Sequence, residues 1–201
     1  MNSVEAGAAA AGNAHGEPSH VDDAAYAHLW NLLRETRARS AAGAAGSGDE
    51  VPRLLFHEAR LLDDRLYDAW LDTFVARCLY GVPSRGDPGD PRTETGIYLD
   101  DRRRLCDRVA MIRSGHLHAQ TPPSRTRRML SNIEQWPGPH DSVRARANVV
   151  IWEYRKGQTR TYPGSQVYEM VRDERGSLAL AIKIVCLLDC DAPQGNYTFI
   201  L

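Results

Sequence analysis

The chain has 201 residues, which is enough for one compact domain and too few for two ordinary ones. Its 42% hydrophobic and 25% charged residues are typical of globular proteins and exclude a wholly disordered chain. The 25 Lys and Arg residues balance 26 Asp and Glu residues. The resulting net charge of −1 argues against a nucleic-acid-binding protein, which needs a basic face.

Neither a membrane span nor a secretion signal is predicted. The longest strongly apolar run, residues 184–188, is far shorter than the roughly 20 residues of a membrane helix. Residues 1–16 contain no Lys, Arg, Leu, Ile or Phe, so both parts of a secretion signal are missing. The four cysteines form no C-x-x-C motif. We interpret them as buried thiols in a reducing cytoplasm, with a metal site at Cys186 and Cys190 as the alternative.

Residues 1–50 form an Ala- and Gly-rich leader, which predicts little buried apolar area and partial disorder. Within the leader, apolar residues recur at helical spacing and predict one extra helix near residues 22–39. Residues 51–201 follow as one predicted domain.

The first part of that domain predicts three helices. Apolar residues return every three or four positions near residues 52–63, 65–74 and 101–113. The turn-rich residues 84–96 predict a loop between the second and third helices. Gly115 predicts the end of the third helix.

After Pro122-Pro123 the apolar period changes from about 3.6 to 2, which predicts a sheet from about residue 126 onward. Residues 173–176 predict a hairpin turn between two of its strands. Helices followed by strands with short turns predict an α+β fold with a curved, mostly antiparallel sheet. The absence of βαβ alternation argues against a doubly wound fold.

Three motifs with histidine could carry chemistry. They are His116-x-His118, His20-x-Asp22 and His57-Glu58. The first could bind a metal but lies in a predicted loop, and in the second Asp22 is better interpreted as a helix cap. The third could perform acid–base chemistry if it faces a cavity, and we favour a surface or partner contact.

The segment Ser124–Arg128 is the densest basic cluster. If it begins a strand, Arg125 and Arg127 share one face while Thr126 and Arg128 share the other. We expect the two arginines of the first face to pair with carboxylates, either on another subunit or on this chain. The candidates on this chain are Asp63, Asp64, Asp100 and Asp101.

Several motifs are missing from the sequence. It contains no Gly-rich phosphate loop, no G-x-S-x-G and no Walker motif. It also lacks the C-x-H and C-x-x-H steps of a Rieske iron–sulfur cluster. Rieske chemistry would therefore have to come from another polypeptide.

Several segments in the ordered part of the chain form a pattern when taken together. In chain order they are Glu58–Asp64 with Tyr67, Trp70 and Leu71; Asp100–Arg102; Arg108-Val109; Pro122–Arg127; Ser131–Ile133; Leu187–Asp189; and Asn196–Leu201. In this pattern the chain resembles the small (β) subunit of aromatic-ring-hydroxylating dioxygenases. The P-P-S-R-T-R run with S-N-I after it is the most specific piece. The Ala-rich leader, and the segment from Tyr162 to Gln166, depart from the family pattern.

The resemblance implies a cone-shaped fold like that of nuclear transport factor 2 (NTF2), with three helices against a curved sheet. It also implies a cytoplasmic complex of three large and three small subunits that dihydroxylates an aromatic substrate, aromatic acids included. The large subunit would carry the Rieske [2Fe–2S] cluster and the mononuclear Fe(II), and a reductase, through a ferredoxin, would deliver electrons from NAD(P)H. We expect no catalytic, cofactor-binding or metal-binding residue on this chain. The structural or interface candidates are Arg125, Arg127, Asn132, Asp63 and Asp64.

A second function from a different class stays open at this point. A free-standing protein of the same cone fold, such as a dehydratase, an isomerase or a small-molecule-binding protein, would use His57 or His118 with an Asp in the cavity. Turnover by this chain without a partner would distinguish it from the dioxygenase subunit.

Overall fold

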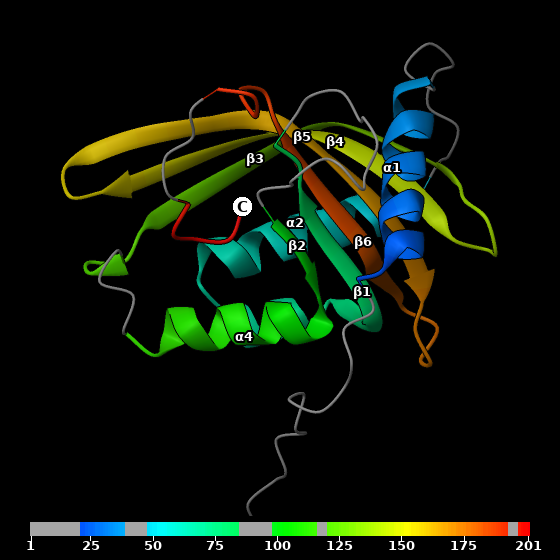
Figure 1. Cartoon of the computed structure of the whole chain (residues 1–201), viewed down its shortest axis with the longest axis horizontal. Coiled ribbons are helices and arrows are strands. Elements are labelled where there is room, and N and C mark those ends of the chain that lie inside the picture. The colour runs from blue at the N-terminus through cyan, green and yellow to red at the C-terminus, as the bar shows by residue number, and fades with distance from the viewer. Residues whose placement is uncertain (1–20, 39–47, 85–97, 116–119, 193–196) are drawn as a thin grey trace, which may run out of the picture.

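A curved six-stranded sheet forms the centre of the molecule (Figure 1). The computed structural model describes residues 21–38, 48–84, 98–115, 120–192 and 197–201. The strands are β1 (Phe74–Val82), β2 (Tyr98–Asp101), β3 (Arg125–Pro137), β4 (Val143–Arg155), β5 (Gln158–Arg172) and β6 (Leu178–Leu187). They are ordered β2-β1-β6-β5-β4-β3, with β1 and β6 parallel and the other neighbours antiparallel. The predicted α+β fold with a mostly antiparallel sheet is confirmed.

The helices of the described residues are α1 (Asp23–Ala38), α2 (Glu50–Asp63), α3 (Tyr67–Leu71) and α4 (Arg102–Arg113). The helices predicted near residues 22–39, 52–63 and 101–113 are confirmed as α1, α2 and α4. The start of α4 is fixed by Asp101, whose carboxylate accepts a hydrogen bond from the N–H of Arg104 at 2.9 Å. None of these helices is long and apolar enough to cross a membrane.

The predicted helix near residues 65–74 is wrong in its length, and the sheet starts earlier than residue 126. α3 is only five residues long because the chain then joins the sheet. The main-chain oxygen of Thr73 accepts a hydrogen bond from the N–H of Leu180 in β6 at 2.8 Å, and β1 follows at once. Cys78, Tyr80 and Val82 of β1 are buried in strand alternation, so the period-2 signal exists but is short.

The long strands match their predicted pattern. Ala145, Ala147, Val149 and Ile151 of β4 are buried, as expected for alternate residues on one face. The predicted hairpin turn between β5 and β6 is confirmed, because the carboxylate of Asp173 accepts hydrogen bonds from two main-chain N–H groups that follow it. The predicted loop at residues 84–96 lies almost wholly outside the described residues.

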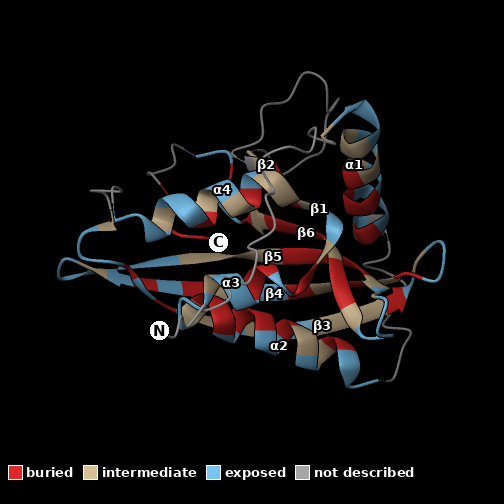
Figure 2. Ribbon diagram, turned by 90° about the horizontal axis from the view of Figure 1, so that it is seen from below, coloured by how far each residue is buried: buried red, intermediate tan, exposed pale blue. Residues whose placement is uncertain are grey.

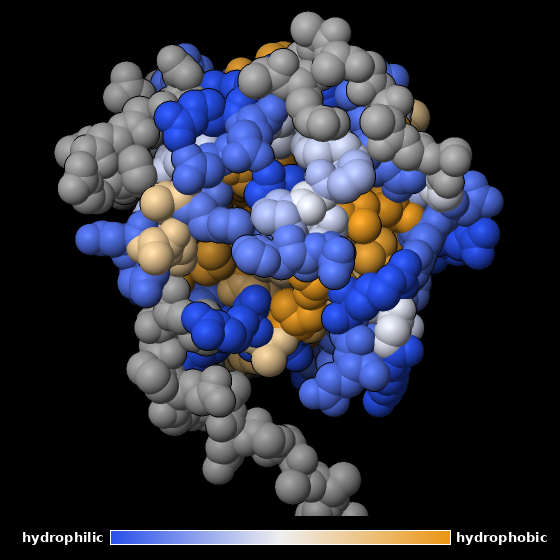
Figure 3. Space-filling view, turned by 90° about the vertical axis from the view of Figure 1, so that its right-hand side faces the viewer, coloured by the Kyte–Doolittle hydropathy of each residue, from blue (hydrophilic) through white to orange (hydrophobic). Residues whose placement is uncertain are grey.

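The sheet has two faces, which are covered differently. The inner face is covered by α2, α3 and α4, whose buried side chains join the main apolar core (Figures 1 and 2). The outer face is covered by α1, where Leu29, Leu32 and Leu33 pack in a separate apolar cluster with residues of β5 and β6. Seen from the α1 end, hydrophobic atoms are ringed by hydrophilic side chains (Figure 3). The division of the chain into a leader and one domain stays a prediction.

Helix α1 covers only one end of the outer face. The hairpin formed by β4 and β5 extends away from α1, together with the first residues of β3 (Figure 1). In that extended part of the sheet, the outer face carries Arg125, Arg127, Met129, Trp152 and Tyr154, which we call the open outer face. All five residues are exposed.

Candidate functional site

The first residues of β3 place their side chains on both faces of the sheet. Thr126 and Arg128 point to the inner face, toward Asp63 at the end of α2. Arg128 Nη1 lies 2.5 Å from Asp63 Oδ1, and the main-chain N–H of Arg128 donates to Asp63 Oδ2 at 2.8 Å. The hydroxyl of Thr126 donates to Asp63 Oδ1 at 2.9 Å. The Arg128 and Asp63 side chains are 1% and 10% exposed, so this is a buried, multiply hydrogen-bonded ion pair.

Arg125 and Arg127 share the outer face, as the strand pattern predicts. The guanidinium of Arg125 lies 4.6 Å from the centroid of the Tyr154 ring, and Arg127 Nη1 donates to the main-chain oxygen of Thr126 at 2.8 Å. Among the described residues neither arginine forms an ion pair. Asp63, one of the four candidate carboxylates on this chain, is bound by Arg128 instead. Pairing of Arg125 and Arg127 with a carboxylate of another subunit stays a prediction.

Four of the five predicted interface candidates line one hollow of about 520 Å³. They are Asp63, Asp64, Arg125 and Arg127, and Trp152 and Tyr154 lie beside them. The fifth candidate, Asn132, is not among its lining residues. Asn132 is exposed and takes a φ of 51° at an irregularity in the pairing of β3 with β4, a conformation that asparagine tolerates better than most residues.

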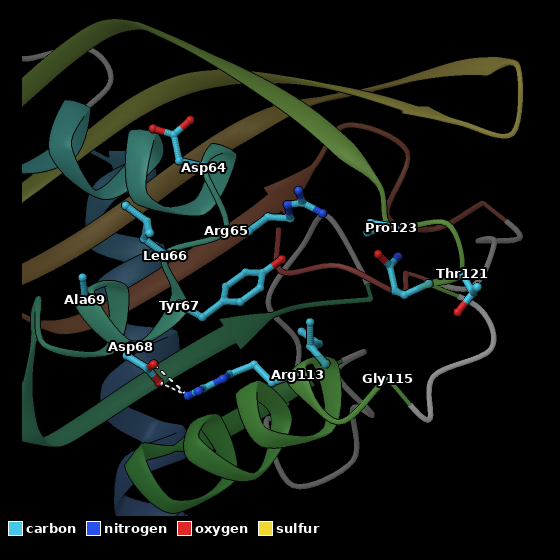
Figure 4. A pocket seen from close by; sticks show the side chains of 12 residues that line it. Asp64, Arg65, Leu66, Tyr67, Asp68, Ala69, Arg113, Gly115, Thr121 and Pro123 are labelled. Carbon is cyan, nitrogen blue, oxygen red and sulfur yellow. Dashed lines mark hydrogen bonds and ion pairs between the residues drawn. The ribbon is translucent and has the colours of Figure 1, made fainter.

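A second hollow, of about 630 Å³, lies between α3, the end of α4 and the chain before β3 (Figure 4). Asp64, Arg65 and Tyr67 line one side of it. On the other side Arg113 Nη1 lies 2.7 Å and 2.8 Å from the two carboxylate oxygens of Asp68. Both side chains of this ion pair are more than half exposed, so it contributes little to stability.

The inner face holds a buried polar cluster that the sequence did not predict. Lys183 Nζ of β6 lies 2.7 Å from Glu58 Oε1 of α2, and the indole N–H of Trp70 donates to the same oxygen at 2.6 Å. The Lys183 and Glu58 side chains are 0% and 1% exposed. Burial lowers the pKa of Lys183, while Glu58 opposes that change.

The last five residues fill the inner face beside this cluster. Residues 197–201 take no helical or strand conformation, and Tyr197, Phe199, Ile200 and Leu201 are buried in the main core. The hydroxyl of Tyr80 donates to the main-chain oxygen of Leu201 at 2.9 Å. The interior of the cone is therefore occupied by the chain itself.

Of the histidines expected for acid–base or metal chemistry, the structure describes His57. His57 is exposed on α2, while its neighbour Glu58 points inward. His20, His116 and His118 lie outside the described residues. Within the described part of the chain, no three side chains of His, Cys, Asp or Glu are grouped so that they could hold a metal ion.

The four cysteines are free; Cys78 and Cys190 are buried, and Cys106 and Cys186 are partly buried. Burial raises the pKa of the Cys78 and Cys186 thiols to about 12. A thiol with so high a pKa is a poor nucleophile at neutral pH, so we assign these two residues to packing.

Helix α1 is held to the outer face by a charged cluster. Arg144 Nε lies 2.8 Å from Glu169 Oε2, and the same guanidinium pairs with Glu35 of α1. His28 of α1 lies 3.2 Å from the other oxygen of Glu169. This hydrogen bond raises the pKa of His28 above its ordinary value. Burial raises the pKa of Glu169, but hydrogen bonds from His28 and Arg144 outweigh it, and the net result is a lowered pKa.

Comparison with known proteins decides the family. A family model described as "Ring hydroxylating beta subunit" matches residues 57–192. The chain belongs to this family. The small oxygenase component of the p-cumate 2,3-dioxygenase system of Pseudomonas putida is 34% identical over 156 residues, which is 76% of this chain and 86% of the relative. The 2-halobenzoate 1,2-dioxygenase small subunit of Burkholderia cepacia is 33% identical over 141 residues, which is 68% of this chain and 86% of the relative.

Solved structures agree with the family assignment. The crystal structure of the β subunit of benzoate 1,2-dioxygenase from Burkholderia mallei is 26% identical with a TM-score of 0.62, over 79% of this chain and 100% of that one. A chain of naphthalene 1,2-dioxygenase with indole bound has a TM-score of 0.67 at 22% identity, over 84% of this chain and 98% of that one, and shows the shared fold. The chain is thus a dioxygenase β subunit, as the resemblance implied, and α1 precedes the matched region.

Proposed function

We propose that this β subunit is non-catalytic and supports a large subunit in a cytoplasmic assembly of three large and three small subunits. The large subunit carries the Rieske [2Fe–2S] cluster and the mononuclear Fe(II), and it dihydroxylates an aromatic substrate with O₂. A reductase, through a ferredoxin, supplies the electrons from NAD(P)H. The names of the p-cumate, 2-halobenzoate and benzoate relatives support an aromatic acid as the substrate class.

One observation carries the non-catalytic role: four of the last five residues, Tyr197, Phe199, Ile200 and Leu201, lie in the main apolar core on the inner face of the sheet, where a cone-fold enzyme would hold its substrate. His57, one of the two histidines that a cone-fold dehydratase or isomerase would use, faces solvent. Among the described residues, no three side chains of His, Cys, Asp or Glu are grouped as metal ligands, and we assign both iron centres to the large subunit.

We assign the contact with the large subunit to the open outer face. Trp152 and Tyr154 are the aromatic residue types that are enriched in interface cores, and they are 37% and 41% exposed. Arg125 and Arg127 add positive charge that has no carboxylate partner among the described residues. A symmetric contact between two copies of this face would bring like charges together. An acidic surface on the large subunit fits this face better.

Co-expression with the large subunit tests the function. We expect the two chains to purify together as a complex of three and three, measured by light scattering on a sizing column. The complex should consume oxygen with an aromatic acid when reductase and ferredoxin are supplied. This chain alone should show no turnover. Turnover by the isolated chain that is lost in His57→Ala would contradict the proposal and favour the free-standing enzyme.

A further inference from the structure

The inner face holds more buried polar groups than a packed core requires. Glu58, Trp70, Tyr80 and Lys183 come from α2, α3, β1 and β6, and each side chain is at most about 1% exposed. A buried ion pair is no more stabilising than apolar side chains of the same volume, so packing alone does not explain the cluster. Burial raises the pKa of Tyr80 far above its ordinary value, which keeps its hydroxyl protonated and able to donate.

The donors of this cluster point at the main chain of residues 197–201. Tyr80 Oη donates to the main-chain oxygen of Leu201 at 2.9 Å, and Lys183 Nζ lies 3.3 Å from the same atom. Arg128 Nη2 donates to the main-chain oxygen of the preceding residue, Ile200. Three side chains from three strands thus bind two consecutive carbonyl groups of this segment.

Aromatic side chains also contact residues 197–201. The Tyr162 ring packs edge-on against the Tyr197 ring at 5.6 Å and tilted against the Phe199 ring at 5.5 Å, measured between centroids. No main-chain ladder joins residues 197–201 to a strand in the described part of the sheet. The segment is therefore held by side chains, as a ligand would be.

The cluster also has binding capacity that the chain does not use. Glu58 Oε2 and Gln166 Nε2 are buried without a hydrogen-bond partner, and both residues are at most 1% exposed. Unpaired buried polar atoms are costly and rare in an interior that serves packing only.

We infer that the cone interior is a binding site for a short apolar peptide, and that residues 197–201 are its built-in occupant. The site recognises two consecutive main-chain carbonyl oxygens through Tyr80, Lys183 and Arg128. It recognises aromatic and aliphatic side chains through Tyr162 and the core. This goes beyond the supporting role in the dioxygenase, and it does not depend on which large subunit is bound.

The inference is tested with a protein that folds as one chain and is cut only afterwards. A specific protease site is inserted between Ala192 and Tyr197, the full chain is folded and purified, and the site is then cut. The probe is the synthetic peptide Tyr-Thr-Phe-Ile-Leu with a fluorescent label. We expect saturable binding to the nicked protein, competed by unlabelled peptide, and a thermal midpoint that rises with peptide concentration. The uncut chain should neither bind the peptide nor gain stability, because its site is filled.

One variant tests Tyr80 as a hydrogen-bond donor to the peptide, and a second variant is its control. Tyr80→Phe removes one hydrogen bond to the occupant and should weaken peptide binding roughly three- to tenfold. Tyr154→Phe, on the open outer face, is the matched control and should leave binding unchanged. Equal binding of a scrambled peptide, equal binding by the uncut chain, or no effect of peptide on the nicked protein would each overturn the inference. Because the large subunit is absent, a failure here leaves the assembly proposal untouched.

Discussion

The inner and outer faces of the sheet differ in how they are completed. The inner face is closed by three helices and by residues 197–201, around the buried pair of Glu58 and Lys183. The outer face is covered at one end by α1 and leaves Arg127 and Trp152 exposed at the other. The two faces therefore have different roles in our proposal. The last residues of the chain pack on the inner face, while the surface that we propose for the large subunit lies on the opposite side of the sheet.

The largest effect is expected on the inner face. Lys183→Met leaves the Glu58 carboxylate buried without its cation, which should lower the free energy of unfolding by about 3–5 kcal/mol. The double variant Glu58→Gln/Lys183→Met keeps an acceptor for the Trp70 indole and should recover part of the loss. Urea unfolding measures both. A Lys183→Met variant as stable as the original chain would show that the pair is not essential to the inner face.

The second largest effect on the free energy of unfolding is expected at the junction between α2 and β3. Asp63→Ala removes the carboxylate that binds Arg128 and Thr126, and should lower the free energy of unfolding by about 3 kcal/mol. Asp64→Ala is the matched control, because Asp64 is exposed and should change the free energy by less than about 0.5 kcal/mol. Similar losses in the two variants would contradict the buried ion pair.

The sequence predicts an element when the pattern that specifies it is local, and does not when the element depends on pairing with residues far along the chain. Helices α1, α2 and α4 and the long strands could be predicted, because their periodicity is local. β1 and β2 could not, because β1 depends on pairing with β6, far along the chain, and β2 in turn pairs with β1. The parallel pairing at Leu180 shortens α3 and overrides the helical stripe that runs through residues 65–74.

The sites differ in the same way. The sequence predicted that Arg125 and Arg127 lie on one face of β3 and Arg128 on the other. The alternation of side chains along a strand does not say which of the two faces contacts Asp63. The pair of Glu58 and Lys183 joins residues 125 positions apart, and Lys183 reads as an ordinary polar residue in an alternating strand. Burial on both faces of β6 becomes visible only once α1 and the inner helices are in place.

On the open outer face, charge reversal should affect assembly and spare folding. Arg127→Glu places a carboxylate against the acidic partner surface that we propose, and should weaken binding of the large subunit roughly tenfold to a hundredfold. Its thermal midpoint should stay unchanged, because Arg127 is exposed. Arg125→Glu should act in the same direction.

Arg175→Glu is the matched control for this assembly test. It makes the same charge change at an exposed turn between β5 and β6, away from the open outer face. Titration with the large subunit, followed by light scattering, gives the affinities. If Arg127→Glu and Arg175→Glu weaken assembly equally, the effect belongs to net charge, and the contact lies elsewhere.

The smallest effect is expected at the covered end of the outer face, where α1 meets Glu169. His28 has a raised pKa, so its contribution is full below its ordinary value of 6.5 and is lost as the pH rises through the folded value. Glu169 has a lowered pKa, so its contribution is full above its ordinary value of 4.5 and is lost as the pH falls through the folded value. The attachment of α1 should therefore be strongest between pH 4.5 and 6.5.

Hydrogen exchange of the α1 main-chain amides at pH 5.5 and pH 8, corrected for intrinsic rates, measures this attachment. In the original chain, the protection of Leu32 and Leu33 should fall roughly two- to fivefold at the higher pH, because His28 is half-exposed and its ion pair is partly screened by solvent. His28→Gln should abolish that difference, since glutamine does not titrate. The amides of α2 serve as the internal control, because α2 packs on the inner face. A pH dependence of α1 that survives His28→Gln would place the titrating group elsewhere, and would leave Arg144 with Glu35 and Glu169 as the contact that holds the helix.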